Sequence, residues 1–232
     1  MAHGDEAERD SLSSPPPSGL FAGNMGDRIH SIVTLAAPTN GTTAYDLFQD
    51  PDFDPDKVTV PLWGRPLTRM MSMGTKPKKD GRDDRDYADY DMQIDNALSL
   101  NRRILTDPSV YYFAVPCSYT TRQEDGTYLP RQKMEPLFVM RSCQIGSYTG
   151  KTRDGFEIDD TWRENDGLVN TVSAKAPIGS ESKPYDKNRI TSGIWNVFPA
   201  YKGDHMALQG GLRYPHDIRR FYLALLRMIS RL

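Results

Sequence analysis

The stretch Ile29-His-Ser-Ile-Val-Thr-Leu-Ala-Ala37 decides the fold, because it is almost continuously apolar, contains β-branched residues and is stopped by Pro38. A strand that is buried on both faces of a parallel sheet has this pattern, since neither of its faces meets water. Residues 110–115, Val-Tyr-Tyr-Phe-Ala-Val, repeat the pattern. Shorter apolar runs at residues 136–140 and 193–198 predict two further strands.

Helical spacing of apolar residues follows these strands along the chain. Residues 90–105 have this spacing loosely. The last segment has it clearly, with arginines on its other faces and with Pro215 at its start. Its apolar residues recur at intervals of three, four and seven: Ile218, Phe221, Tyr222, Leu225, Ile229 and Leu232. Strands that alternate with helices predict an α/β fold with a mostly parallel sheet.

The composition excludes several classes of protein. The 232 residues suit one domain or one and a half. A net charge of −2, from 29 basic and 31 acidic side chains, argues against a nucleic-acid partner. No run reaches the roughly 20 apolar residues that a transmembrane segment needs. Because only 38% of the residues are hydrophobic, the core is expected to be thin for a chain of this length.

Two regions carry little structural information. Residues 1–20 contain acidic side chains followed by the block Ser13-Ser-Pro-Pro-Pro-Ser18, which predicts a ragged or disordered start. This start has neither the basic end nor the apolar stretch of a signal peptide. Cys117 and Cys143 each lie beside an apolar run, and the sequence leaves their pairing open. The interpretation we favour is two half-buried thiols.

Chemistry is expected just beyond the carboxyl ends of parallel strands. Asp166 lies in the turn Glu164-Asn-Asp-Gly167, which an apolar run follows, and His205 lies in a loop between a predicted strand and the last helix. Each has a plain alternative, since Asp-Gly is a common turn pair and a loop histidine is commonly a surface residue. Their order matches the α/β-hydrolase triad, in which an acid and then a histidine follow the nucleophilic serine along the chain.

Four ordered segments resemble motifs of the bacterial true lipases of the thermoalkalophilic Gram-positive type and of clostridial lipases, within the α/β-hydrolase superfamily. They are Leu35–Thr43 (LAAPTNGTT, with Thr39 where the family has His), Asp159–Asn170 (DDTWRENDGLVN), Gly193–Asn196 with Asp204–His205, and Asp217–Tyr222 (DIRRFY). The resemblance covers roughly residues 19–232. It implies that Asp166 is the acid and His205 the base of a Ser-Asp-His triad that hydrolyses the ester bonds of acylglycerols or small esters.

The serine of that triad is missing from the sequence, because neither G-x-S-x-G nor A-x-S-x-G occurs in it. In the family the nucleophile, the oxyanion loop and the early strands precede the Leu35–Thr43 segment. We therefore expect a partial α/β-hydrolase fold, the C-terminal portion of a lipase without its nucleophile half, that is inactive alone. The strand at residues 32–37 should then have an unpaired neighbour side. The alternative is a catalytically inactive fragment or a remnant that binds lipid or another ligand.

The resemblance to the lipases implies only part of their metal-binding residues in this sequence. Asp91, in Tyr90-Asp-Met92, resembles one of the family's zinc aspartates and is a conditional zinc ligand; taken alone it belongs to a solvated run of acids. Calcium is not expected, because Ala207 stands where the family has Glu. A zinc enzyme that uses His30 or His216 has little support, since no histidine pair has metal-ligand spacing. No organic cofactor is predicted.

Residues 47–69 lie where the family has a lid, which would cover an acyl pocket and open at a lipid interface. Four prolines in this stretch preclude a long helix, and a plain loop is an equal alternative. The predicted organisation is a ragged start at 1–20 and a lipase-like domain at 21–232, with 47–86 as lid or insert. The resemblance also implies an extracellular protein.

Overall fold

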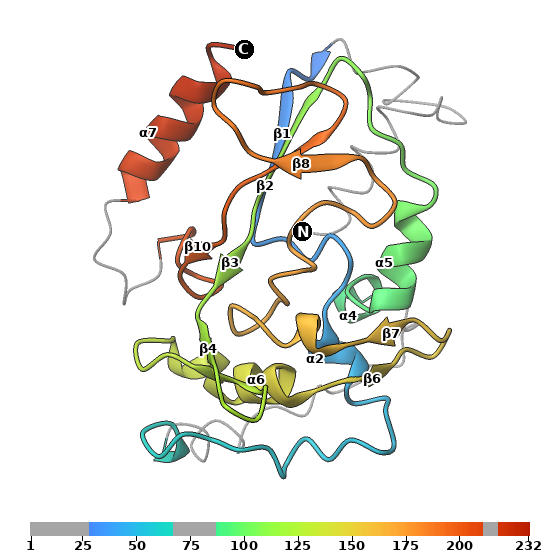
Figure 1. The fold of residues 1–232 in the computed structure, drawn as a ribbon, viewed down its shortest axis with the longest axis vertical. Coiled ribbons are helices and arrows are strands. Elements are labelled where there is room, and N and C mark those ends of the chain that lie inside the picture. The colour runs from blue at the N-terminus through green and yellow to red at the C-terminus, as the bar shows by residue number, and fades with distance from the viewer. Residues whose placement is uncertain (1–27, 67–86, 211–217) are drawn as a thin grey trace.

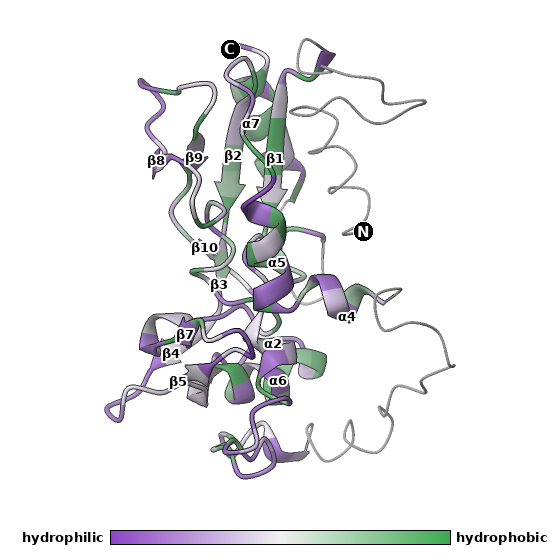
Figure 2. Ribbon diagram, turned by 90° about the vertical axis from the view of Figure 1, so that its right-hand side faces the viewer, coloured by the Kyte–Doolittle hydropathy of each residue, from purple (hydrophilic) through white to green (hydrophobic). Residues whose placement is uncertain are grey.

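A computed structural model describes residues 28–66, 87–210 and 218–232. Its central element is a four-stranded sheet in the order β1-β2-β9-β8, in which every neighbouring pair is parallel. The strands are β1 (Ser31–Leu35), β2 (Tyr111–Val115), β8 (Ser182–Pro184) and β9 (Trp195–Val197), and Figure 2 shows them in the order of the sheet. Three of these four strands fall where the sequence predicts them.

The strand β2 is the centre of the core. Its residues 112–115 are buried, because Tyr112 and Ala114 pack with Trp195 on one face while Val115 packs with Ala36 and Leu208 on the other. The helix α7 (Ile218–Ile229) lies against this second face through Ile218 and Phe221. The continuous apolar pattern therefore has the physical cause expected for it, burial from both sides.

The first strand lies at an edge of the sheet. β1 pairs with β2 from Ser31–Tyr111 to Leu35–Val115, and within the described residues no strand pairs with its other side. This agrees with the unpaired side expected for residues 32–37. Such an edge presents a row of backbone donors and acceptors that another strand could bind.

The helix predicted at residues 90–105 is two short helices, α4 (Ala88–Asp91) and α5 (Ile94–Asn101). The break has a long-range cause, because residues from a distant segment bind the backbone groups that a continuous helix would use. The Met92 carbonyl accepts from Thr42 N at 2.8 Å, and Ile94 N donates to the Asp46 carboxylate at 3.1 Å. Asp46 thereby provides the side-chain acceptor that Gln93, at the N-cap of α5, does not.

The prediction of a strand at residues 136–140 is wrong. These residues begin the helix α6 (Pro136–Ser147), which buries Phe138, Val139 and Cys143 on one side. Pro136 occupies the first helical position, where its missing N–H costs nothing and its fixed φ suits the helix. A five-residue apolar run fits a buried strand and the inner face of a helix equally, so the run alone could not separate them.

The remaining elements lie beyond the carboxyl ends of β1 and β2, toward the lower part of Figures 1 and 2. They are α2 (Thr43–Asp46), the 3-10 helix η3 (Asp160–Trp162) and three two-stranded pairs. The pairs are β3 (Cys117–Ser118) with β10 (Tyr201–Lys202), β4 (Thr120–Arg122) with β5 (Tyr128–Pro130), and β6 (Gly150–Lys151) with β7 (Glu157–Ile158). This is the end of a parallel sheet where functional loops gather.

Several predictions concern residues outside the described part. These are the ragged start at 1–20, the second half of the 47–86 insert, His216 and Pro215. Cys117 and Cys143 are both free and fully buried, more deeply than the half-buried thiols that we favour from the sequence. No helix among the described residues has the length and apolarity to cross a membrane.

Candidate active site

Asp166 and His205 lie in contact although 39 residues separate them. The His205 Nδ1 atom is 3.0 Å from Asp166 Oδ2. Asp166 belongs to the loop that follows η3, and His205 comes three residues after β10. The short parallel pair of β10 with β3 holds the His205 loop beside the end of the main sheet. Both residues therefore belong to loops at the edge where the sequence predicts chemistry.

The loop around Asp166 fixes its carboxylate. Asp166 is fully buried, and its Oδ1 accepts hydrogen bonds from Leu168 N at 3.0 Å and Val169 N at 2.8 Å. This turn requires glycine at position 167, where φ is +103° and a Cβ would lie 2.5 Å from Phe138 Cβ. With Oδ1 bound to the backbone, Oδ2 is left to face the imidazole.

Two asparagines that the sequence did not single out hold this loop in place. Asn165 and Asn170 are completely buried on either side of Asp166. Asn165 Oδ1 accepts from Ser142 Oγ at 2.8 Å, which ties the loop to α6. Asn170 accepts from Thr43 N at 2.9 Å and donates to Thr43 Oγ1 at 2.8 Å. Asparagine in a loop usually indicates only a turn, so nothing in the sequence pattern distinguished these two.

The segment after β1 provides the other support. Thr42 Oγ1 donates to the Leu168 carbonyl at 2.7 Å, within the Asp166 turn. Asn40 is buried and its side chain donates to the Ser173 and Ala176 carbonyls at 3.1 and 3.0 Å. Thr39 Oγ1 donates to the Ser173 carbonyl at 2.6 Å. The segment thus has a structural role here, because its polar side chains pair with the backbone of the following loop.

The loop of His205 and the ring of Phe138 position its imidazole. Its own backbone N donates to the Asp166 carbonyl at 2.9 Å, and the edge of Phe138 meets its ring at 6.0 Å between centroids. The neighbouring Asp204 is fully buried, with its carboxylate accepting from Glu135 N at 2.8 Å and Met206 N at 3.0 Å. These contacts leave 17% of the His205 side chain exposed, so that the ring is positioned but reachable.

Burial, the Asp166 hydrogen bond and nearby charge compete in setting the protonation of His205. Burial is the largest effect and opposes the charged form, but the hydrogen bond to Asp166 and the negative charges of Asp166 and Asp204 outweigh it. The pKa of His205 is therefore raised above its ordinary value. A basic imidazole oriented by a buried carboxylate suits a general base.

No nucleophile stands opposite this base among the described residues. The His205 ring makes no further hydrogen bond there, and the nearby Ser118 hydroxyl donates to Glu164 Oε1 at 2.5 Å instead. The Cys117 thiol is buried, and burial together with Asp166 and Asp204 raises its pKa, so it is not activated as a thiolate. The pair can therefore accept and release a proton, but no hydroxyl or thiol of the described residues is hydrogen-bonded to the imidazole.

An apolar cluster adjoins the imidazole. It consists of Met134, Phe138 and Val139, with Trp63, Tyr119, Leu168 and Met206 packed against them. Trp63 comes from the 47–66 part of the predicted lid, and Gly64 allows a close approach, because a Cβ there would lie 2.9 Å from Val139. The described part of that segment thus packs on α6 beside the site. Its Leu62 is 77% exposed.

The described residues contain no set of side chains that is arranged to bind a metal ion. No group of three or more His, Cys, Asp or Glu side chains is placed to hold a metal ion there. Asp91 is the last residue of α4 and half-buried, and His30 packs against Tyr111, with 5.5 Å between ring centroids. Asp91 alone does not make a zinc site, and its role as one of several zinc ligands stays a prediction. Ala207, where the resemblance led us to expect no calcium ligand, is buried.

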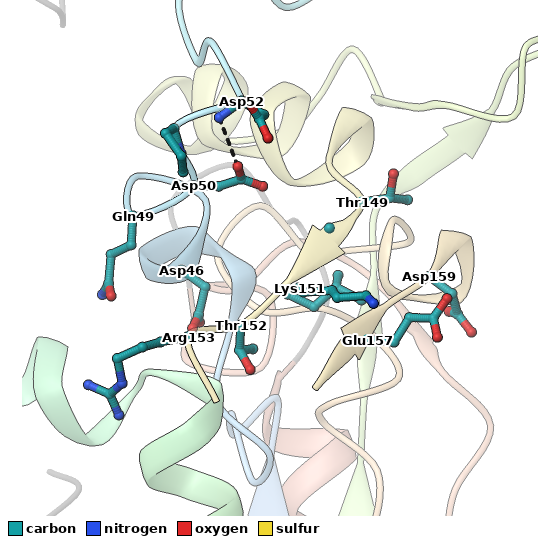
Figure 3. Close-up of a pocket in the computed structure, with 13 residues that line it drawn as sticks. Asp46, Gln49, Asp50, Asp52, Thr149, Lys151, Thr152, Arg153, Glu157 and Asp159 are labelled. Atoms are coloured by element: carbon teal, nitrogen blue, oxygen red, sulfur yellow. Dashed lines mark hydrogen bonds between the residues drawn. The ribbon is translucent and has the colours of Figure 1, made fainter. Parts of the chain in front are cut away.

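A separate polar cleft of about 800 Å³ opens between α2 and the β6–β7 pair (Figure 3). Its walls mix acidic side chains such as Asp46 and Glu157 with Lys151 and Arg153. Asp50 and Asp52 belong to a turn in which Asp52 N donates to Asp50 Oδ1 at 2.9 Å. The cleft shares no residue with the Asp166–His205 pair. Two of its carboxylates connect distant segments, because Asp46 accepts from Ile94 N at 3.1 Å and Asp50 Oδ2 accepts from the Tyr148 hydroxyl at 3.0 Å.

Comparison with known proteins gives these features a context. Residues 78–223 match the family described as "Lipase-like, C-terminal domain". The chain is 27% identical over 210 residues to a lipase of Staphylococcus hyicus, covering 81% of this chain and 31% of that protein. It is 27% identical over 227 residues to Lipase 1 of Staphylococcus aureus strain MRSA252, covering 89% and 32%. The chain thus spans about a third of the length of these relatives.

Solved structures show the same fold. The Clostridium botulinum EstA structure superposes with a TM-score of 0.71 at 24% identity, covering 97% of this chain and 61% of that one. The Staphylococcus hyicus lipase structure gives 0.62 at 24% identity, covering 87% and 57%. The prediction of a partial α/β fold of the lipase type, made from the strand patterns and the four motifs, is confirmed.

Proposed function

Because the chain belongs to the family of lipase-like C-terminal domains, we propose that it supplies the acid and the base of a carboxylic-ester hydrolase. The observation that carries the proposal is the 3.0 Å contact between His205 Nδ1 and the fully buried carboxylate of Asp166. In this assignment the serine nucleophile comes from polypeptide outside these 232 residues, since the sequence holds no nucleophile motif. The unpaired side of β1 within the described residues supports a neighbouring strand from such a segment.

The proton follows a simple route. His205 Nε2 takes the proton of the serine hydroxyl as its oxygen attacks the ester carbonyl, and returns it to the alkoxide leaving group when the tetrahedral intermediate collapses. In the second half-reaction Nε2 takes a proton from water and returns it to the serine. Asp166 keeps the hydrogen on Nδ1 and stabilises the imidazolium in each step. The raised pKa of His205 favours the charged form that each step creates.

We infer an acylglycerol or small ester as substrate, since the relatives are named lipases and an apolar wall of Met134 and Phe138 lies beside the imidazole. Trp63 extends that wall from the segment proposed as a lid. The chemistry needs no organic cofactor, because side chains carry out every proton transfer. A lipid interface and an extracellular location follow from the lipase resemblance and belong to the same proposal.

The test uses p-nitrophenyl butyrate with two proteins. The 232-residue chain alone should show no turnover above background. A longer polypeptide that joins it to a nucleophile-bearing segment should hydrolyse the ester, and His205→Ala should remove nearly all of this activity. Turnover by the chain alone that His205→Ala abolishes would place the nucleophile within these residues. Full activity of the longer His205→Ala protein would reject His205 as the base.

A further inference from the structure

A second concave site lies between α7 and the loop that follows β8. This groove has a volume of about 630 Å³. Half-buried apolar side chains line its floor: Tyr185, Ile190, Met228 and Leu232. Exposed cations stand on its rim: Lys187 from the loop, and Arg227 and Arg231 from the helix. The groove shares no residue with the Asp166–His205 pair or with the polar cleft of Figure 3.

The loop side of the groove is held by specific contacts. Tyr185 stacks on Phe198 with 3.8 Å between ring centroids and 14° between ring planes, and its backbone N donates to the Val197 carbonyl at 2.8 Å. The Lys183 ammonium donates to the Arg189 carbonyl and, at 2.5 Å, to Thr191 Oγ1. These contacts attach this wall of the groove to the sheet.

The side chains on the rim of the groove give it an excess of positive charge. Residues 218–232 contain four arginines and no acidic residue. Among the described residues, no ion pair joins Lys187, Arg227 or Arg231 to a carboxylate. The single acid of residues 182–190, Asp186, accepts from Asn188 N at 2.9 Å and so shapes the turn. Three cations thus surround an apolar floor, and the terminal carboxylate of Leu232 is the one opposing charge among the residues that line the groove.

We propose that this groove binds one molecule of a long-chain alkyl carboxylate. Guanidinium groups pair with carboxylates through two parallel hydrogen bonds, which suits a headgroup between Arg227 and Arg231. The alkyl chain then lies along Ile190, Met228 and Leu232, where it leaves water. A concave floor with cations above it favours a single amphiphile over a flat lipid surface, which would meet only the rim. This binding goes beyond the proposed ester hydrolysis and requires no turnover.

The test is calorimetric titration of the 232-residue chain with sodium decanoate below its micelle concentration. Saturable binding of one molecule is expected. Acetate has the carboxylate without the alkyl chain, and decyltrimethylammonium has the alkyl chain with a positively charged headgroup. Both should therefore bind at least tenfold more weakly than decanoate. Equal binding of decyltrimethylammonium, or binding only to phosphatidylglycerol vesicles and not to decanoate, would overturn the proposal.

A matched pair of variants locates the binding. Arg227→Gln combined with Arg231→Gln should weaken decanoate binding about tenfold. Arg219→Gln combined with Arg220→Gln removes the same charge from the same helix, at positions outside the groove, and should leave the affinity unchanged. Circular dichroism melting checks that both variants fold. Equal weakening in both would show a general effect of net charge, and no weakening in the first would place the ligand elsewhere; either result rejects the groove.

Discussion

His205 and Asp166 are joined twice, by the side-chain contact between Nδ1 and Oδ2 at 3.0 Å and by the backbone bond from His205 N to the Asp166 carbonyl at 2.9 Å. The backbone bond sets the distance between the two loops, and the side-chain contact sets the orientation of the ring. A substitution that keeps the shape of Asp166 should therefore change the chemistry of the pair without separating the loops.

Asp166→Asn tests this separation of shape from charge. Asn can still accept from Leu168 N and Val169 N, so the loop should persist, but its amide favours the wrong imidazole tautomer. In the longer, serine-bearing polypeptide we expect kcat to fall about 10⁴-fold with a nearly unchanged melting temperature. Asp125→Asn, in the exposed β4–β5 turn, is the control and should retain activity. Full activity of the Asp166→Asn protein would remove Asp166 from the triad.

The protonation of His205 gives a second prediction. The pKa of its imidazole is raised because the bond to Asp166 and the charges of Asp166 and Asp204 outweigh burial. A raised histidine pKa adds stability that is fully present below the unfolded value of about 6.5 and is lost as pH rises through the folded value. NMR titration of the 232-residue chain should place the His205 midpoint above 6.5, and Asp166→Asn should lower it. A midpoint that stays the same in that variant would contradict the proposed coupling.

Some of the strands and helices could be predicted from the sequence, and others could not. The strands at residues 29–37 and 110–115 were predictable because side chains that pack on both faces of a sheet form an uninterrupted apolar run. Most of β2 is buried, whereas β1 is half-buried along most of its length. The run at 136–140 was wrongly predicted to be a strand, because five apolar residues fit a strand and one face of a helix equally well. Only the burial of residues further along the chain, such as Cys143, identifies the helix α6. The break between α4 and α5 depends on Thr42 and Asp46, which are distant in sequence.

The candidate site could also be predicted from the sequence only in part. Asp166 and His205 emerged from the order of the motifs and from the lipase resemblance. Their contact depends on the pairing of β10 with β3, two-residue strands without a pattern of their own. The supports Asn165 and Asn170 are indistinguishable from turn residues until their burial is known. Periodicity thus reports which residues are buried together in regular elements, while a site in loops is set by individual long-range hydrogen bonds.

Gly167 should tolerate no side chain. An alanine there would have to adopt φ near +103° and would place its Cβ 2.5 Å from Phe138 Cβ, beside the His205 ring. We expect Gly167→Ala to lower the free energy of unfolding by about 2 kcal/mol or more in urea titration. Gly155→Ala is the matched control, because φ is +90° there but nothing lies within 4 Å of the added Cβ, so about 1 kcal/mol is expected. Equal losses would show that the Phe138 contact is unimportant.

Asp46 makes the stability of the chain depend on pH. Burial raises the pKa of its carboxyl to about 7, with a smaller contribution from Asp95 and against the opposing hydrogen bond from Ile94 N. The unfolded state loses this proton near pH 4 and the native state near pH 7, so native Asp46 binds the extra proton between them. The free energy of unfolding must then fall as pH rises through this range.

Asp46→Asn should remove most of that fall, because Asn is neutral at every pH and its oxygen can still accept from Ile94 N at the start of α5. Since one pKa unit corresponds to about 1.4 kcal/mol, the difference in unfolding free energy between pH 5 and pH 8 should shrink by at least about 1 kcal/mol in urea titrations. Asp54→Asn removes an exposed carboxylate from the following segment and should leave the difference nearly unchanged. If Asp46→Asn retained the full pH dependence, native Asp46 would have to be ionised throughout, and another group would bind the proton.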